Sequence, residues 1–468
     1  MTEQKFKEIV EYIKTIIKDS KFENHCYVVG GAVRDFVMKN EIKDIDICVD
    51  IENGGVLFSQ LLYEKGYTKS SPKIFPTYGT SMFHLKKFPD LEIECVQTRG
   101  EQYHDKNTRN PICTFADIKE DCFRRDLTIN TLYINISTND ILDLTGNGLN
   151  DIKNSICRVT NNNPDIVFTD DPLRILRVIR FATRFDFKID NKTWESMVKF
   201  SSRLDIISKE RIRDEFNKMI TSSSPCRAIQ LLLEVGAMKF IIPEILETIG
   251  LEQNKYHFGD VFEHTMCSLE KCENNDLVVR LSCLLHDIGK IKCKTIGNDG
   301  RIHFYDHEYI GSNMIYDILT NLKYPNNIID EVTFLVKYHM FTKSWGDDCS
   351  KMKLKSLRKL QYKCKNIDKF NKLLDVIDAD NKSHHPDYVL NNQVKLIKEY
   401  VNNQPEDEKM FNYKLPINGN DIMEIMNLSP GKEIQIYLNH CLKIAYSKPN
   451  ITKEELIKRI KNDKIKLN

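Results

Sequence analysis

Hydrophobic residues follow different periods in different parts of the chain. Six apolar residues near the start would share one face of a helix over residues 1 to about 20: Phe6, Ile9, Val10, Ile13, Ile16 and Ile17. From about 25 to 145, short β-branched runs divided by Gly, Pro, Asn and Asp predict strands. These runs are CYVVGG, DIDICVD, SMFHLKKF, LEIECVQT and TLYINI. Helical spacing then continues almost to the end, so we expect an α+β head followed by a long all-helical part.

The composition is typical of a folded chain with several domains. The length of 468 residues exceeds one ordinary core, and 41% of the residues are hydrophobic. The 68 basic and 67 acidic residues nearly cancel, so any contact with nucleic acid must come from local basic patches. The fourteen cysteines contain no C-x-x-C pair, and no apolar stretch approaches the roughly 20 residues of a membrane span. We therefore expect a cytoplasmic protein with reduced thiols and no membrane contact.

Two carboxylates lie close together in the segment YVVGGAVRDFVMKNEIKDIDICVD. Side chains at i and i+2 of a strand point the same way, so Asp44 and Asp46 would aim at one point. Magnesium could bind there together with substrate phosphates. Gly30 and Gly31 would let backbone N–H groups approach phosphate oxygens, and Arg34 could add a charged fork. A lone D-x-D pattern is more often an acidic loop, but the glycines and the arginine favour a site for metal and nucleotide.

A third acid could come from the segment LEIECVQT. Glu92 and Glu94 alternate there with apolar residues along a predicted strand, so both face away from the apolar side. One of them could complete a two-metal cluster. The alternative is an ordinary exposed edge of the sheet.

A helix rich in arginine is predicted in the segment DDPLRILRVIRFATRF. Pro172 suits its first turn, and the two aspartates before it suit the cap. Arg174, Arg177 and Arg180 recur every three residues among aliphatic side chains, which favours a cleft or phosphate-binding groove over a solvated helix face. Asp171 and Arg174 offer an acceptor and a forked donor one turn apart. Such a pair can bond the Watson–Crick edge of a nucleobase without a template.

Histidines and aspartates recur in the helical second half. The string HDIGK, which holds His286 and Asp287, resembles the HD phosphohydrolase superfamily. The other residues of this pattern are His264, His307 and Asp380, with His339 as a further candidate. Imidazole and carboxylate groups suit transition metals or magnesium. The site would either bind a second divalent metal and hydrolyse phosphoesters, or be a retained fold that shapes an RNA-binding body.

Seven ordered motifs between residues 25 and 220 resemble one family, the class II tRNA nucleotidyltransferases and bacterial poly(A) polymerases. They are VVGGAVRD, KDIDICVD, VQTRGEQYHDKNTRNP, IKEDCFRRDLTINTLYIN, DLTGNGLNDIKNSICRV, FTDDPLRILRVIRFATRFDF and ISKERIRDEFNKMI. The resemblance implies a nucleotidyltransferase-fold head, a mixed sheet with helices, over 1–150. It also implies an all-α remainder: a neck over 151–225, an HD-type body over 226–400 and a tail over 401–468.

The resemblance also implies roles for single residues. Asp44 and Asp46 would hold magnesium, with Glu94 rather than Glu92 as the third acid. The residues implied to bind the nucleotide are Gly30, Gly31, Arg34, Arg125, Asp126, Asn130, Asp171, Arg174, Arg177 and Arg180. Among them, the residues at 171 and 174 would read the base.

The predicted activity is template-independent addition of CMP and AMP to the 3′ end of tRNA, from CTP and ATP with Mg²⁺. The 3′ hydroxyl would attack the α-phosphorus, and pyrophosphate would leave. One alternative is a poly(A) polymerase, A-adding or CC-adding enzyme of the same family. Others are an HD-type phosphohydrolase acting on RNA ends, or an RNA-binding protein without activity. Neither the oligomeric state nor the role of residues after about 400 follows from the sequence.

Overall fold

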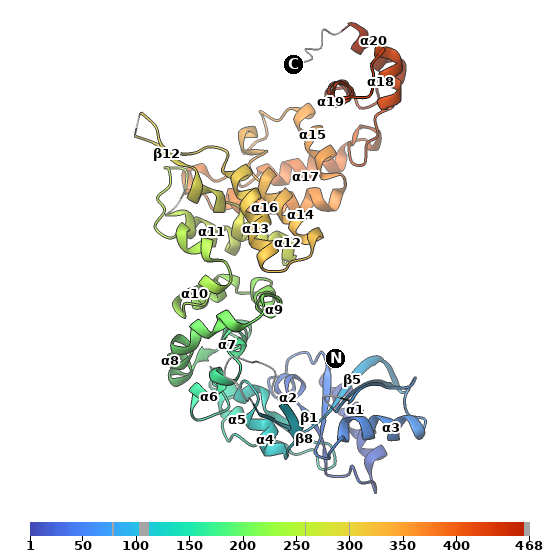
Figure 1. Ribbon diagram of the computed structural model, residues 1–468, viewed down its shortest axis with the longest axis vertical. Coiled ribbons are helices and arrows are strands. Elements are labelled where there is room, and N and C mark those ends of the chain that lie inside the picture. The colour runs from blue at the N-terminus through green and yellow to red at the C-terminus, as the bar shows by residue number, and fades with distance from the viewer. Residues whose placement is uncertain (77–78, 103–111, 258, 299, 463–468) are drawn as a thin grey trace. The chain divides into compact units, whose positions relative to one another are not determined.

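The computed structural model describes residues 1–76, 79–102, 112–257, 259–298 and 300–462 (Figure 1). The chain divides into two compact units, Met1–Ile241 and Ile242–Asn468. The finer domain boundaries expected at 150, 225 and 400 stay predictions. No helix of the described residues is long and apolar enough to cross a membrane.

The first unit is built on a mixed sheet of seven strands in the order β3-β4-β5-β2-β1-β8-β9. Its strands are β1 Cys26–Val29, β2 Ile45–Val49, β3 Lys73–Phe75, β4 Thr80–Leu85, β5 Phe88–Gln97, β8 Leu132–Asn135 and β9 Ile141–Asp143. Strand β2 pairs antiparallel with β1 and parallel with β5. The α+β head with a mixed sheet is thereby confirmed.

Helices cover this sheet and continue beyond it. They are α1 Glu3–Ile17, α2 Gly31–Val37, α3 Gly54–Glu64, α4 Ile118–Phe123, α5 Gly148–Lys153, α6 Pro164–Asp170, α7 Leu173–Phe185, α8 Asn191–Phe200, α9 Lys209–Ile220 and α10 Pro225–Glu234. All six apolar residues predicted to share one face of the first helix are buried in α1. Each contributes about 1.5–3 kcal/mol by leaving water. They join the core formed by the inner faces of β1, β2 and β5.

The second unit is mostly helical, as the spacing predicted. Its helices are α11 Val261–Lys271, α12 Leu277–Leu285, α13 His307–Asn321, α14 Asn326–Tyr338, α15 Leu354–Cys364, α16 Ile367–Lys382, α17 Gln393–Asn403, α18 Gly419–Met426, α19 Lys432–Ala445 and α20 Lys453–Asn462. The last three form a hydrophobic cluster of their own.

Two small sheets interrupt the helices that were expected to follow the head, and a third lies within the head. The sheet within the head pairs β6 Arg99–Gln102 with β7 Ile112–Phe115. Beyond residue 150, the first unit holds the pair β10 Ile156–Cys157 and β11 Lys188–Ile189. The second holds β12 Lys294–Ile296 and β13 Ile302–Phe304. The expectation of an all-helical remainder is therefore wrong in this detail. Strands of two or three residues are too short to show an alternating pattern in the sequence.

Candidate active site and metal centre

An acidic cluster lies where β2 and β5 run side by side. The parallel register places Asp46 directly beside Glu94, and Asp44 lies one residue before β2. Burial raises the pKa of Asp46 to about 6; repulsion from Glu94 and Asp44 adds to this, and Arg125 opposes it. Both other predicted acids therefore lie close enough to Asp46 to repel its charge. Such a set of hard oxygen donors fits a divalent cation. Glu92 lies elsewhere on β5, 4.0 Å from Lys73.

The glycine pair forms the turn from β1 into α2. Gly30 has φ +73°, a conformation that favours glycine, and Gly31 is the first helical residue. A Cβ at Gly30 would lie 3.7 Å from Arg125 Nη1, so this turn and that guanidinium are neighbours. The Gly30 N–H donates to the Leu132 carbonyl at 3.3 Å, so it is already bonded within the sheet.

Arg34 is buried, with an exposed fraction of 3%. Its Nε and Nη2 donate to Asp35, each at 2.9 Å, and its Nη1 donates to Asn130 Oδ1 at 2.6 Å. The guanidinium lies over the rings of Phe185 and Phe181, at 4.7 and 5.2 Å from their centroids. In this structure Arg34 thus ties α2 to α7, and its predicted contact with the triphosphate stays a prediction.

Arg125 is held by a carboxylate that the sequence reasoning missed. Its Nε and Nη2 donate to Asp121 Oδ2 at 3.0 and 2.8 Å. The fully buried Asp121 also accepts bonds from Arg124 and from the Tyr133 hydroxyl. Burial opposes ionisation of Asp121, but Arg125 and Arg124 hold its pKa at about 2. The sequence does carry a signal for this contact. Asp121 lies three residues before Arg124 and four before Arg125, and side chains at these spacings can form ion pairs.

The neck arginines pair with buried acids. Arg177 donates to Asp126 Oδ2 from Nε at 2.8 Å. Asp126 also accepts a bond from Asn130 at 3.1 Å. Arg180 Nε lies 2.8 Å from Glu215, on α9. The predicted nucleotide-binding residues at 126, 130, 177 and 180 are therefore brought together, but as a network within the protein that joins the head to α7 and α9.

The two residues expected to read the base lie at the start of α7. Asp171 accepts a bond from the Leu173 N–H at 3.1 Å and another from Arg211 Nη2 at 2.8 Å. Arg174 donates from Nη2 to the Arg124 carbonyl at 2.5 Å. The structure thus places Arg174 beside the pair Arg124 and Arg125, and Asp171 beside α9.

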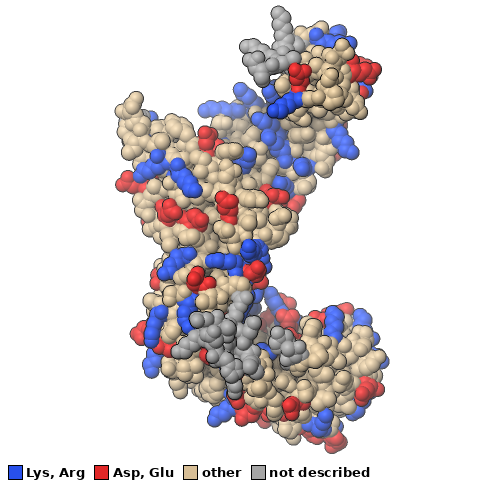
Figure 2. Space-filling view, viewed as in Figure 1, with Lys and Arg blue, Asp and Glu red and all other residues tan. Residues whose placement is uncertain are grey.

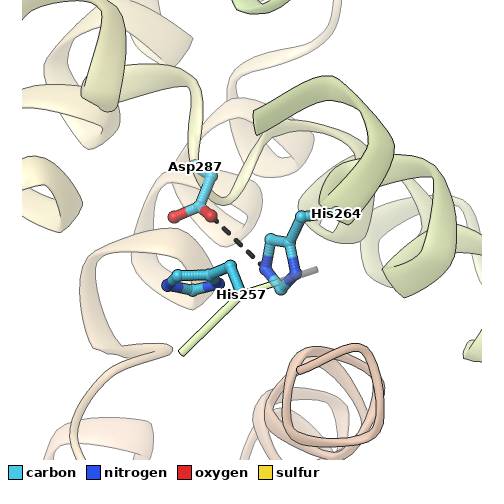
Figure 3. Close-up of side chains that lie close together, drawn as sticks. All are labelled: His257, His264 and Asp287. Atoms are coloured by element: carbon cyan, nitrogen blue, oxygen red, sulfur yellow. Dashed lines mark ion pairs between the residues drawn. The ribbon is translucent and has the colours of Figure 1, made fainter. Parts of the chain in front are cut away.

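The second unit brings predicted metal ligands from three helices to one buried place. His264 lies on α11, His286 and Asp287 follow α12, and Asp380 lies on α16. His264 Nε2 is 3.1 Å from Asp380 Oδ1. The same nitrogen is 3.4 Å from Asp287 Oδ2 (Figure 3). His286 Nε2 is 3.3 Å from the same Asp287 oxygen. These four predicted ligands therefore surround one point.

His307, the fifth predicted ligand, approaches Asp287 from α13. Its Nε2 lies 3.3 Å from Asp287 Oδ1. The further candidate His339, which follows α14, lies 3.9 Å from that oxygen. Asp287 is therefore shared between two groups of histidines.

Two lysines and further histidines that were not predicted surround this centre. Lys290 Nζ lies 2.6 Å from Asp287, and Lys343 Nζ lies 3.2 Å from Asp380. Burial opposes the ionisation of Asp287, but Lys290 and then His286 hold its pKa well below the usual range. His257 lies beside His264 (Figure 3). Within the described residues, three groups of these side chains could hold a metal ion, and their imidazole and carboxylate donors, all buried except the half-buried His257, fit one.

Three family models match successive parts of the chain. The poly A polymerase head domain matches residues 26–158, the probable RNA and SrmB-binding site of polymerase A matches 186–248, and the HD domain matches 244–381. The acidic cluster lies in the first match and the histidine centre in the last. Fold and sites together define a nucleotidyltransferase head joined to an HD domain.

Two curated proteins are similar to this chain in sequence. A "Multifunctional CCA protein" of Haemophilus ducreyi is 30% identical, over 67% of this chain and 74% of that protein. An "A-adding tRNA nucleotidyltransferase" of Deinococcus radiodurans is 31% identical, over 52% of this chain and 56% of that protein. The chain belongs to the class II family of CCA-adding tRNA nucleotidyltransferases and poly(A) polymerases that carry an HD domain.

A solved structure shares the fold over nearly the whole length. The CCA-adding enzyme of Bacillus stearothermophilus, solved in complex with CTP, superposes with a TM-score of 0.68. It covers 98% of both chains at 18% sequence identity. At this identity the likeness shows the fold alone.

Proposed function

We propose that this protein adds CMP and AMP to the 3′ end of tRNA without a template, using CTP and ATP. The observation that carries the proposal is the pairing of Asp46 with Glu94 in register, with Asp44 and Arg125 close by. These three carboxylates suit a divalent metal ion, and the guanidinium of Arg125 suits the triphosphate bound to that ion. The relatives named for CCA and A addition support the choice of tRNA as the acceptor.

The head residues would act mainly by positioning and charge. Asp44, Asp46 and Glu94 would hold Mg²⁺, which when bound supplies charge neutralisation for the triphosphate. Arg125, fixed by Asp121, would meet the phosphates from the side of the Gly30 turn. The tRNA 3′ hydroxyl would lose its proton to solvent and attack the α-phosphorus. The bond from that phosphorus to the oxygen it shares with the β-phosphate would break, and pyrophosphate would leave with that oxygen. Positioning of this kind can lower a barrier by about 7–11 kcal/mol.

Nucleotide choice would come from Asp171 and Arg174 at the start of α7. Their present bonds to Arg211 and to the Arg124 carbonyl hold them in fixed directions. A cytosine or adenine edge would replace some of these bonds with its own donors and acceptors. Asp171→Ala is expected to reduce the preference for CTP and ATP over UTP and GTP about tenfold or more. An unchanged preference, measured as ratios of kcat/KM, would remove Asp171 from base reading.

The proposal is tested with purified protein and a tRNA that ends at its discriminator base. CTP alone should add two residues, and CTP with ATP should complete C-C-A. Addition of A by ATP alone to a tRNA ending in C-C should also occur. Long homopolymeric A tails would replace the proposal with poly(A) synthesis, and addition of A alone would make this an A-adding enzyme.

The histidine centre favours a second activity, hydrolysis of phosphoesters at RNA ends. His264, His286, Asp287 and Asp380 would hold a divalent metal of the kind that imidazole prefers. The test is release of product from a 2′,3′-cyclic phosphate with Mn²⁺, Co²⁺, Ni²⁺ or Mg²⁺. If Asp287→Ala hydrolyses the substrate as fast as the wild type, the hydrolysis comes from a contaminant. If the wild type hydrolyses nothing with any of these metals, the histidine centre has a structural role only.

A basic surface on the second unit suits the RNA backbone. Residues 349–367 contain seven Lys and Arg and no Asp or Glu. Five of the lysines are exposed, and none of them has an ion pair within the described residues: Lys351, Lys353, Lys355, Lys359 and Lys365. Figure 2 shows blue side chains gathered around this part of the chain, which holds α15. In a chain of net charge +1, such a local patch is where phosphates would bind.

Removing two of these lysines should weaken tRNA binding without changing the chemistry. Lys355 and Lys359 lie one turn apart on α15, so Lys355→Ala with Lys359→Ala removes neighbouring charges. We expect the Kd for tRNA to rise about tenfold at low salt and the slope of log K against log salt to fall by about 1.5–2. The matched control is Lys65→Ala with Lys69→Ala on the first unit. If both double variants lose the same affinity for tRNA, or if neither loses any, tRNA does not bind specifically to the basic surface of α15.

A further inference from the structure

Two tyrosines from distant segments stand side by side on the second unit. The ring centroids of Tyr256 and Tyr388 are 4.8 Å apart, and the ring planes meet at 75°. Aromatic pairs of this edge-to-face kind often lie inside a core, but Tyr256 is 46% exposed. The pair therefore presents aromatic surface to the solvent.

Backbone contacts hold the two segments together. The His385 N–H donates to the Tyr256 carbonyl at 3.0 Å, and the backbones of His257 and His384 form an isolated β-bridge. The Tyr256 N–H also donates to Asn254 Oδ1 at 3.2 Å. The backbone that carries the tyrosines is thus ordered before any ligand arrives, which lowers the entropy cost of binding.

A lysine lies over both rings. Lys255 Nζ is 5.6 Å from the centroid of the Tyr256 ring and 5.9 Å from that of the Tyr388 ring. Lys255 is exposed, and it has no ion pair with an acid within the described residues. Aromatic faces that stack on bases, beside a cation that binds phosphate, are the combination with which proteins hold single-stranded nucleic acid.

The tyrosine pair borders the histidine centre. His257 follows Tyr256 directly, and its ring centroid lies 4.5 Å from that of His264 (Figure 3). The same ring lies 4.7 Å from the ring of His384, four residues before Tyr388. In a nucleotide, one ribose separates the base from the 3′ phosphate. A base held on the tyrosines would therefore bring the phosphate of an RNA end toward the centre.

We propose that Lys255, Tyr256 and Tyr388 form a binding site for the unpaired nucleotide at the end of an RNA. The base lies against the tyrosine rings, and Lys255 binds a phosphate oxygen. Every base has a face that can stack, so the site accepts any of the four bases but requires an end that is not paired. Its role in selecting substrates for the histidine centre rests on the phosphoester hydrolysis proposed above, whereas the binding itself does not.

Fluorescence of a labelled RNA tests the binding without activity. The probe is a short single-stranded RNA that ends in 2-aminopurine with a 2′,3′-cyclic phosphate, because stacking quenches the fluorescence of this base. In EDTA, we expect the full chain to quench the probe, and Tyr256→Ala with Tyr388→Ala to raise its Kd about tenfold. Tyr256→Phe with Tyr388→Phe keeps both rings and should keep the Kd. The matched control is Tyr316→Ala, at an exposed tyrosine on α13, which should bind as the wild type does.

Pairing of the RNA end separates this site from other RNA contacts. The same probe annealed to a complementary strand should bind the wild type and the alanine double variant equally. Lys255→Ala is the second variant, should the double variant fail to fold, and it should raise the Kd and lower the slope of log K against log salt by about 1. A Kd that neither variant changes, or an equal loss of affinity for paired and unpaired RNA, would overturn the proposal.

Kinetics separate failure of this site from failure of the second activity. With Mn²⁺, the alanine double variant should raise the KM for the cyclic phosphate about tenfold and leave nucleotide addition unchanged. If the wild type hydrolyses nothing while quenching still depends on the tyrosines, the hydrolysis is lost and the binding site stands. If hydrolysis occurs with a KM that the variant does not change, the binding site is wrong and the hydrolysis stands.

Discussion

Replacing Asp46 with asparagine is expected to reduce nucleotide addition on the order of 10³-fold and, in the same protein, to raise the stability of the metal-free head. The first effect follows because Asp46 would be lost as a ligand of Mg²⁺ beside Glu94. The second follows because a half-buried carboxylate beside two like charges costs free energy when no cation is bound. One substitution should thus separate function from stability.

The stability effect of Asp46→Asn depends on pH in a defined direction. Burial, with repulsion from Glu94 and Asp44, raises the pKa of Asp46 from 3.8 to about 6 in the folded protein. The free energy of unfolding therefore falls as pH rises from about 4 to about 6, and it stays lower above that range. The loss is about 2–3 kcal/mol, and asparagine avoids it.

Thermal melting in EDTA at pH 5 and pH 8 measures this difference. The variant should exceed the wild type at pH 8, and the gap should shrink at pH 5. Asp90→Asn, at an exposed aspartate on β5, is the matched control and should change neither activity nor melting. A variant that melts below the wild type at pH 8 in EDTA would contradict the view that the acids repel.

Asp121→Asn is expected to cost the first unit about 3–5 kcal/mol. The substitution leaves Arg124 and Arg125 close together without the carboxylate that pairs with both. It also weakens the bond from the Tyr133 hydroxyl to a charged acceptor. Nucleotide addition should fall with it, because Arg125 would no longer be held beside the Gly30 turn.

Hydrogen exchange measured by mass spectrometry tests this prediction within one molecule. Peptides from β1 and β8 should exchange faster in Asp121→Asn, while peptides from α12 and α16 in the second unit serve as the internal control. Glu120→Gln, at an exposed neighbouring acid, is the matched control variant. Equal protection of β8 in the two variants would show that Asp121 does not anchor the arginine pair.

Local patterns in the sequence predicted the elements well, because burial of one helix face or strand face is encoded at fixed spacing. The buried face of α1 and the alternation around Glu94 are examples. Contacts between segments that are distant in the sequence could not be predicted from such local patterns. Asp46 lies beside Glu94 through strand register, and Arg177 pairs with Asp126, which lies 51 positions before it in the sequence. The strand pattern alone left Glu92 and Glu94 open as the third acid, and the resemblance to a known family chose Glu94.

Burial of charged groups was the main feature that the sequence could not supply. Arg34 was expected at a phosphate, yet its donors are engaged by Asp35 and Asn130. Likewise the string HDIGK indicated His286 and Asp287, but nothing in the pattern showed that Asp287 faces two groups of histidines. Such features depend on how three or more helices pack, which a pattern along one segment does not encode.

The measurement that tests the central claim most directly is the 3′-end sequence of a tRNA incubated with CTP and ATP and either Asp44→Ala or Asp287→Ala. The first variant lacks a predicted Mg²⁺ ligand of the head, and the second lacks the shared carboxylate of the histidine centre. We predict no addition by Asp44→Ala and a complete C-C-A end by Asp287→Ala. Addition that survives Asp44→Ala, or that depends on Asp287, would contradict the assignment of nucleotidyl transfer to the head.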